Sequence, residues 1–191
     1  SAPTAWPNQF LAVLSKNCTT PEGIQKEYES MIKFYNIDIE ALKYECSTLG
    51  VTTSFLHIGR IGYVWSPFSD RCIRLPMPVK PISPTWMVDA DYLRDDVINS
   101  VQVTSWEKMD HFYHETTMNP KRPVRVYSPI DNKGDDAQED YAVFLPYAVK
   151  SSDFEVPEVC QNNVVDSTLE RIQIEESNIY YCILGDLQRP M

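Results

Sequence analysis

The chain has 191 residues, of which 43% are hydrophobic and 23% charged, and its formal net charge is −10 at pH 7. A chain of this size and composition can bury a full core, so we expect one globular domain over residues 1–191. The acidic balance argues against nucleic acid and anionic membrane surfaces, because both attract clustered Lys and Arg. No apolar run approaches the length of a transmembrane helix, and the opening "SAPTAW" would suit the mature N-terminus of a secreted protein.

Most segments are rich in β-branched and aromatic residues and are separated by turn residues, a pattern typical of strands. The predicted strands are residues 41–46, 51–58, 63–68, 71–77, 98–106, 111–118, 123–128 and 140–149. Residues 24–35 fit a strand with Ile24, Tyr28, Ile32 and Phe34 on one side, and they also fit a helix, so periodicity leaves this stretch open. Eight or so short strands predict an antiparallel barrel or a pair of packed sheets.

One helix is predicted near the C-terminus. Ser167 and Glu170 have the spacing of a capping box, and Leu169 and Ile172 form an apolar edge. We therefore expect a single C-terminal helix against a curved sheet.

Five cysteines, at positions 18, 46, 72, 160 and 182, contain no CxxC pair, which argues against zinc. Their wide spacing suits long-range disulfides in an oxidising compartment, and the alternative is buried thiols in a cytosolic protein. Asn17 begins an N-x-T glycosylation sequon, which favours the secreted interpretation. An odd count leaves one thiol over, and Cys18 is the expected spare or intermolecular cysteine.

No catalytic motif is present, so we expect no enzyme activity. His111 and His114 form an HxxH, but residues three apart on a strand point to opposite faces and would not share a metal. The acidic residues 131–140 have the oxygen chemistry of a calcium site, with Asp131, Asp135 and Asp136 as candidate ligands. The alternative is a solvated hairpin loop.

Aromatic side chains on or beside the predicted strands are the candidate binding site. Small barrels and curved sheets can enclose one apolar ligand, and aromatic rings supply rigid contact area for it. The alternative is that these rings are plain core. The candidates are Phe55, Trp65, Trp86, Trp106, Phe112, Phe144 and Tyr147.

The order and spacing of several segments resemble the ependymin-related family of secreted proteins. These segments are "PNQFLAVLS" (7–15), "MIKFYNIDIEALKYEC" (31–46), "IGYVWSPFSDRCIRLPM" (61–77), "ISPTW" (82–86), "INSVQVTSWEK" (98–108) and "SSDFEVPEVC" (151–160). The family has a cysteine before the Pro-x-Gln-aromatic motif, and this chain lacks both that cysteine and its usual partner. The joint absence is what the loss of one whole disulfide would produce.

The resemblance implies a mostly β fold of the bacterial lipoprotein-carrier type, in which curved antiparallel sheets form a half-open barrel or cup around a hydrophobic cavity. It also implies a secreted glycoprotein that binds calcium and forms a homo- or heterodimer. Carried over by position, Cys72 would pair with Cys160, and Cys46 with Cys182.

We therefore expect a secreted, non-enzymatic carrier of one hydrophobic ligand, such as a lipid, fatty acid or carotenoid. The alternative is a calcium-dependent adhesion or matrix glycoprotein without a stored ligand.

Overall fold

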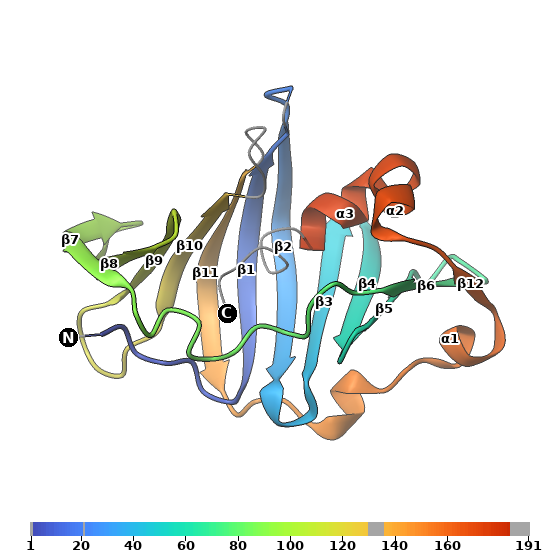
Figure 1. The fold of residues 1–191 in the computed structure, drawn as a ribbon, viewed down its shortest axis with the longest axis horizontal. Coiled ribbons are helices and arrows are strands. Elements are labelled where there is room, and N and C mark those ends of the chain that lie inside the picture. Colours follow the sequence, from blue (N-terminus) through green and yellow to red (C-terminus); the bar gives the residue numbers. More distant parts are fainter. Residues whose placement is uncertain (1, 21, 130–135, 184–191) are drawn as a thin grey trace.

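The computed structural model describes residues 2–20, 22–129 and 136–183, and within them twelve strands form one strongly curved sheet (Figure 1). The strand order is β12-β6-β5-β4-β3-β2-β1-β11-β10-β9-β8-β7. The strands are β1 (Gln9–Thr19), β2 (Gln25–Asn36), β3 (Ala41–Thr48), β4 (Val51–Ile58), β5 (Ile61–Trp65), β6 (Cys72–Pro76), β7 (Asp91–Ile98), β8 (Val101–Lys108), β9 (His111–Thr116), β10 (Pro123–Pro129), β11 (Asp136–Pro146) and β12 (Val164–Asp166).

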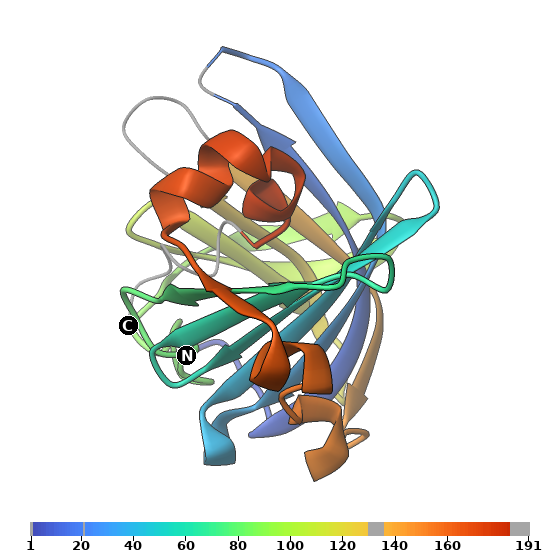
Figure 2. The same ribbon diagram turned by 90° about the vertical axis from the view of Figure 1, so that its right-hand side faces the viewer.

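The sheet is open, with β12 and β7 as its two edges. Every described strand pair is antiparallel except β12 with β6, which is parallel. The side view shows how strongly the sheet curves (Figure 2). The predicted class, a mostly β fold with a curved, half-open sheet, is therefore confirmed, whereas the alternative of two packed sheets is wrong.

Residues 24–35, for which periodicity allowed either a strand or a helix, lie almost entirely in strand β2. Its pairing with β1 shifts register, because Leu14 lies opposite Met31 while Lys16 lies opposite Tyr28. This bulge places Tyr28 on the same face as Met31, and Ile32 and Phe34 on the other face. The predicted grouping of Tyr28 with Ile32 and Phe34 is therefore wrong, since one extra residue reverses the alternation.

The predicted strand 98–106 consists of the last residue of β7, a turn, and most of β8. Asn99 and Ser100 have positive φ angles of 50° and 64° and form the tight turn between β7 and β8. Strand β7 lacks the apolar alternation that predicts a strand, because most of its residues are charged or exposed, as suits an edge strand.

Residues 77–90, here called the strap, join β6 to β7 and cross one face of the sheet (Figure 1). The strap contributes Met77, Ile82, Trp86 and Met87 to the main core. We call the face that it covers the inner face, and the opposite face the outer face.

The C-terminal part contains η2 (Ser151–Phe154), α1 (Glu158–Asn162), α2 (Leu169–Glu175) and α3 (Ser177–Ile183), and a further short helix, η1 (Ile37–Ile39), joins β2 to β3. Of the C-terminal elements, α2 and α3 cover another area of the inner face (Figure 1), whereas η2 packs on the outer face. Ile172 of α2 and Ile179 of α3 are buried in the main core. The expectation of a single helix is therefore wrong, and no described helix has the length and apolar character needed to span a bilayer.

Helix α2 begins one residue later than predicted. Its N-cap is Thr168, whose hydroxyl accepts a hydrogen bond from the Arg171 backbone N–H at 3.3 Å. Ser167 instead donates its backbone N–H to the carbonyl of Arg74 at 2.9 Å, which holds it in line with β12. The capping box of Ser167 with Glu170 is therefore wrong.

A smaller core lies on the outer face. Phe154 of η2 packs against Ala41 and Leu56, and the partly buried Trp65 adjoins this cluster. Adjacent residues of β4 divide between the two cores, because Phe55 belongs to the main one and Leu56 to the outer one.

Candidate functional site

The inner face is lined with aromatic rings, and four of the predicted binding residues are among them. Phe55, Trp86 and Trp106 are buried in the main core, and Phe144 packs against it. Trp86 is on the strap, where its ring centroid lies 6.0 Å from that of Tyr113. The structure thus brings these four side chains to one face.

The other three candidates lie elsewhere. Trp65 packs on the outer face, because Val64 takes the inward position of β5. Phe112 contacts Tyr127 at a centroid distance of 5.8 Å and alternates with the inward Tyr113. Tyr147 follows β11 and is 67% exposed. None of these three rings belongs to the main core of the inner face, and their part in ligand binding stays a prediction.

Sequence reasoning missed several inner rings that are more central. Phe10 stacks with Tyr35 at 4.8 Å and lies 5.5 Å from Trp6, and Tyr28 and Tyr44 are also buried in the main core. For Phe10 the available signal was a strand-like alternation over residues 10–18, whose positions 10, 12, 14, 16 and 18 are all buried in the structure.

The same alternation places a charged side chain, that of Lys16, on the inner face. Lys16, Lys33 and Glu139 are at most 1% exposed and come from the neighbouring strands β1, β2 and β11. Each lysine Nζ lies 4.0 Å from a carboxylate oxygen of Glu139. We call these three residues the lysine cluster. Removing charged groups from water costs free energy, and the attraction between the lysines and Glu139 offsets part of that cost.

Further contacts surround the lysine cluster. Lys16 donates to the Cys182 carbonyl at 2.8 Å, and Lys33 donates to the Tyr141 hydroxyl at 3.3 Å. The Lys33 Nζ also lies 4.9 Å from the Trp6 ring centroid and 5.5 Å from that of Tyr44. The inner face is therefore amphipathic, with ammonium groups set among aromatic rings.

A cavity of about 310 Å³ lies at the rim of the inner face, between α3 and the β3–β4 hairpin. We call it the rim cavity, and its lining residues are Tyr28, Cys46, Thr48, Leu49, Val51, Thr53, Asn178 and Ile179. Its volume is at the lower end of the range of roughly 300–1,000 Å³ typical of small-molecule sites.

A smaller cavity of about 30 Å³ lies where the N-terminal residues meet the strap, between Trp6, Trp86 and Tyr113. Nearby, Glu115 is fully buried and accepts from the Thr4 backbone N–H, at 3.2 Å to each carboxylate oxygen. Burial raises the pKa of Glu115 above its ordinary value, against the opposing effect of Thr4.

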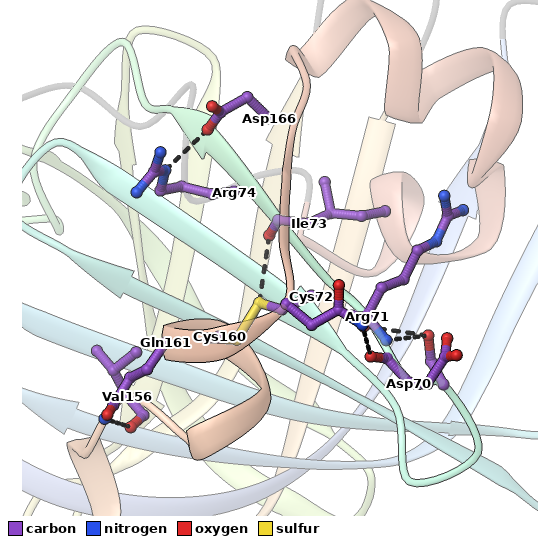
Figure 3. The surroundings of a disulfide bond; sticks show 11 residues. Asp70, Arg71, Cys72, Ile73, Arg74, Val156, Cys160, Gln161 and Asp166 are labelled. Carbon is purple, nitrogen blue, oxygen red and sulfur yellow. Dashed lines mark hydrogen bonds and ion pairs between the residues drawn. A yellow bond between two sulfur atoms is a disulfide. The ribbon is translucent and has the colours of Figure 1, made fainter.

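Both disulfides implied by the family resemblance occur in the structure. Cys46–Cys182 joins β3 to α3 beside the rim cavity. Cys72–Cys160 joins β6 to α1, as Figure 3 shows. Around it, the Cys72 N–H donates to the Asn163 carbonyl at 2.9 Å, and β12 pairs with β6. This second bond fixes the chain between η2 and α2 to one edge of the sheet.

The fifth cysteine is the spare thiol, which was one of its two expected roles. Cys18 remains a thiol, is 1% exposed and donates to the Tyr181 carbonyl at 3.2 Å. Such burial beneath α3 contradicts the expectation of an intermolecular disulfide.

The two histidines of the HxxH separate as the strand alternation predicts. His111 contacts Ser128 at 3.1 Å and adjoins Trp86 on the inner face, whereas His114 contacts Ser105 at 2.7 Å. Burial is the main cause that lowers the His114 pKa to about 4, and nearby Arg125 and Arg94 contribute. In the part of the chain that the structure describes, no group of three or more His, Cys, Asp or Glu has the geometry of a metal site.

The structure describes only some of the residues predicted to bind calcium or to carry a glycan. Asp131 and Asp135 lie outside the described residues, whereas Asp136 begins β11 and accepts from the Thr19 N–H at 3.3 Å and the Tyr127 hydroxyl at 3.2 Å. Asn17 is exposed on β1. Calcium binding and glycosylation stay predictions.

The described chain defines a class of protein by its architecture: an open, curved β sheet whose inner face is covered by a strap and C-terminal helices. No protein-family profile matches the sequence, and no curated protein matches it either.

Among solved structures, the chain is similar to an uncharacterized conserved protein from Thermus thermophilus, with a TM-score of 0.55, 12% identity, and coverage of 84% of this chain and 91% of that chain. A LolA superfamily protein from Nitrosomonas europaea has a TM-score of 0.42 and 13% identity, over 80% of this chain and 92% of that one. A putative outer membrane lipoprotein-sorting protein domain from Vibrio parahaemolyticus has a TM-score of 0.41 and 12% identity, over 78% and 89%. At these identities the first likeness concerns the fold alone, and the two lower scores carry no functional argument. Membership of the ependymin-related family stays a prediction.

Proposed function

We propose that this protein is a secreted carrier that binds one hydrophobic ligand, such as a lipid, fatty acid or carotenoid, against the inner face of its sheet. The observation that carries the proposal is the rim cavity, which opens beside an inner face lined with buried aromatic rings. Apolar burial in such a site yields ~25 cal/mol per Å² before the costs of ordering the ligand.

The cover over the inner face supports reversible binding. The strap has no regular helix or strand, and it is held by contacts such as the Tyr35 hydroxyl to the Ile82 carbonyl, at 2.6 Å, and Lys108 to the Trp86 carbonyl, at 3.0 Å. Helix α3 is short and is tethered to β3 by Cys46–Cys182. A cover made of short, tethered pieces can shift without unfolding the sheet beneath it.

Secretion is part of the proposal because two disulfides join distant parts of the chain. Disulfides of this kind persist in oxidising compartments. A homo- or heterodimer also remains part of the proposed assembly.

The experiment is a search for the ligand followed by a binding measurement. Protein from a eukaryotic secretion host is extracted with organic solvent, the extract is analysed by mass spectrometry, and the emptied protein is titrated with a fluorescent lipid. We expect a recovered apolar molecule or saturable lipid binding. Absence of both would refute the carrier function.

A matched pair of variants locates the site. Thr53→Trp fills the rim cavity from β4 and should weaken lipid binding at least tenfold, whereas Thr52→Trp, whose side chain does not line that cavity, should leave binding unchanged. Equal effects of the two variants would contradict the assignment of the ligand to the rim cavity.

A further inference from the structure

The hydroxyl of Tyr44 is an unusual buried group. Tyr44 lies on β3, is fully buried in the main core, and its hydroxyl oxygen has no hydrogen-bond partner among the described residues. A buried hydroxyl without a partner is a liability that phenylalanine would not carry. This hydroxyl is therefore a candidate donor to a group that the protein takes up.

The lysine cluster lies beside the same ring. The Nζ atoms of Lys16 and Lys33 are 5.8 Å and 5.5 Å from the Tyr44 ring centroid, and both side chains are fully buried. Two ammonium groups and the Tyr44 ring thus lie side by side on three adjacent strands. Together with Glu139 the two lysines carry a net charge of +1, so an anion placed beside Tyr44 would gain a charge-assisted hydrogen bond and a net attraction that Glu139 reduces.

The rim cavity adjoins this group. Cys46, which lines the cavity, follows Tyr44 by two residues on the same face of β3. Tyr28, which also lines the cavity, lies directly opposite Lys16 in the β1–β2 pairing. Tyr44, Lys16 and Lys33 do not line the cavity themselves, but they lie next to residues that do, so a chain-like molecule that extends inward from the cavity would bring one end towards the ammonium groups and the Tyr44 hydroxyl.

We propose that the ligand is an amphiphile with a carboxylate head group, which accepts a hydrogen bond from Tyr44 and is attracted by Lys16 and Lys33 while its alkyl chain occupies the rim cavity beneath α3. This inference rests on the proposed carrier function and names the ligand class for it. Tyr44 and the two lysines then set head-group preference, and the aromatic and aliphatic lining sets affinity for the chain.

The test compares two ligands that share one chain and differ in the head group. Dodecanoic acid and dodecanol are each titrated into the intact, disulfide-bonded protein by displacement of a fluorescent probe at neutral pH. We expect the acid to bind about tenfold or more tightly than the alcohol, because a hydrogen bond to a charged group is worth that ratio or more.

Three variants assign the preference to its residues. Tyr44→Phe should reduce acid affinity several-fold and leave alcohol affinity unchanged, and Lys33→Met should reduce acid affinity further. Tyr63→Phe, which removes a hydroxyl from the outer cluster, should change neither. If Lys33→Met fails to fold, Tyr44→Phe carries the test, because it removes one oxygen that has no described partner.

The outcomes separate this inference from the carrier function. Equal binding of acid and alcohol, or an equal loss of both in Tyr44→Phe, would overturn the carboxylate assignment and leave the carrier function standing. Binding of neither ligand, together with no binding of lipid, would overturn both.

Discussion

Charged pairs lie on both faces of this sheet, but in different surroundings. On the outer face, Arg125 makes a bidentate contact with Asp140, at 2.6 Å and 3.0 Å, and both side chains remain partly exposed. On the inner face, each lysine of the lysine cluster lies 4.0 Å from Glu139, and all three side chains are buried. The ion pair with the shorter, bidentate contacts is therefore the partly exposed one on the outer face.

The difference teaches what each set of charges is for. Exposed ion pairs contribute roughly 0–1 kcal/mol, so the outer pairs affect solubility and local order more than stability. Buried charges are costly to desolvate, and apolar residues of similar size are often as stabilising. Stability alone therefore does not account for the inner charges, and they are the groups that the proposed carboxylate ligand would engage.

The largest expected effect comes from removing the inner carboxylate. Glu139→Gln leaves Lys16 and Lys33 without that charge and should lower the free energy of unfolding by about 3 kcal/mol. The matched control on the outer face is Glu45→Gln, which breaks the 3.5 Å pair with Lys43 and should cost less than about 1 kcal/mol. Chemical denaturation of both variants measures this, and equal losses would erase the distinction between the faces.

A smaller effect is expected where the inner face holds the strap. Tyr35→Phe removes the hydroxyl that donates to the Ile82 carbonyl at 2.6 Å and should cost about 1–2 kcal/mol. Tyr44→Phe removes an equally buried hydroxyl without a described partner and should change stability by less than about 0.5 kcal/mol. Thermal unfolding of the two variants decides, and a larger loss for Tyr44 would mean that its hydroxyl does support the fold.

The smallest effect concerns pH and the outer face. Burial and the neighbouring Arg125 and Arg94 lower the His114 pKa to about 4, while Asp96 and Asp140 act in the opposite sense. A lowered folded-state pKa means that the unfolded chain binds the proton first, so this contribution is complete above about pH 6.5 and is lost as pH falls towards 4. The full shift would correspond to roughly 3 kcal/mol, and residual solvation of the His114 ring reduces this, so we expect a loss on the order of 1 kcal/mol over that window.

His114→Gln provides the control for this pH dependence. In this variant the free energy of unfolding should depend less on pH between pH 6.5 and 4. The carboxylates that titrate at lower pH remain in place. An unchanged slope would assign the acid sensitivity to other groups, such as His57, whose pKa burial also lowers.

Much of the fold was predictable because local patterns and tertiary structure agree there. Residues 41–46 and 51–58 became β3 and β4, since a short turn at Leu49 and Gly50 joins two β-rich segments. The prediction of strand faces and strand bounds failed where a bulge or a tight turn interrupted the regular alternation of side chains. The bulge in β2 reversed the faces on which its side chains lie, and the turn at Asn99 and Ser100 made β8 begin three residues later than the predicted strand.

The candidate site was less predictable. Trp86 and Phe55 face inward as expected, but Trp65 does not, because a strand in isolation has no inside. Lys16 and Lys33 were missed since lysine usually marks a solvated position, and their place in the inward alternation of β1 and β2 became meaningful only when the sheet curved.

By itself the sequence determined that the chain would be mostly β, because β-branched and aromatic residues at alternate positions favour a pleated, half-buried backbone. The family resemblance supplied the two disulfide pairings that the structure contains. The tertiary structure alone decided which face became the interior, because the strap and α3 come from distant parts of the chain and bury whichever side they cover. That choice placed two lysines and the Tyr44 hydroxyl beside a cavity, since side chains acquire common surroundings only when separate strands are paired in register.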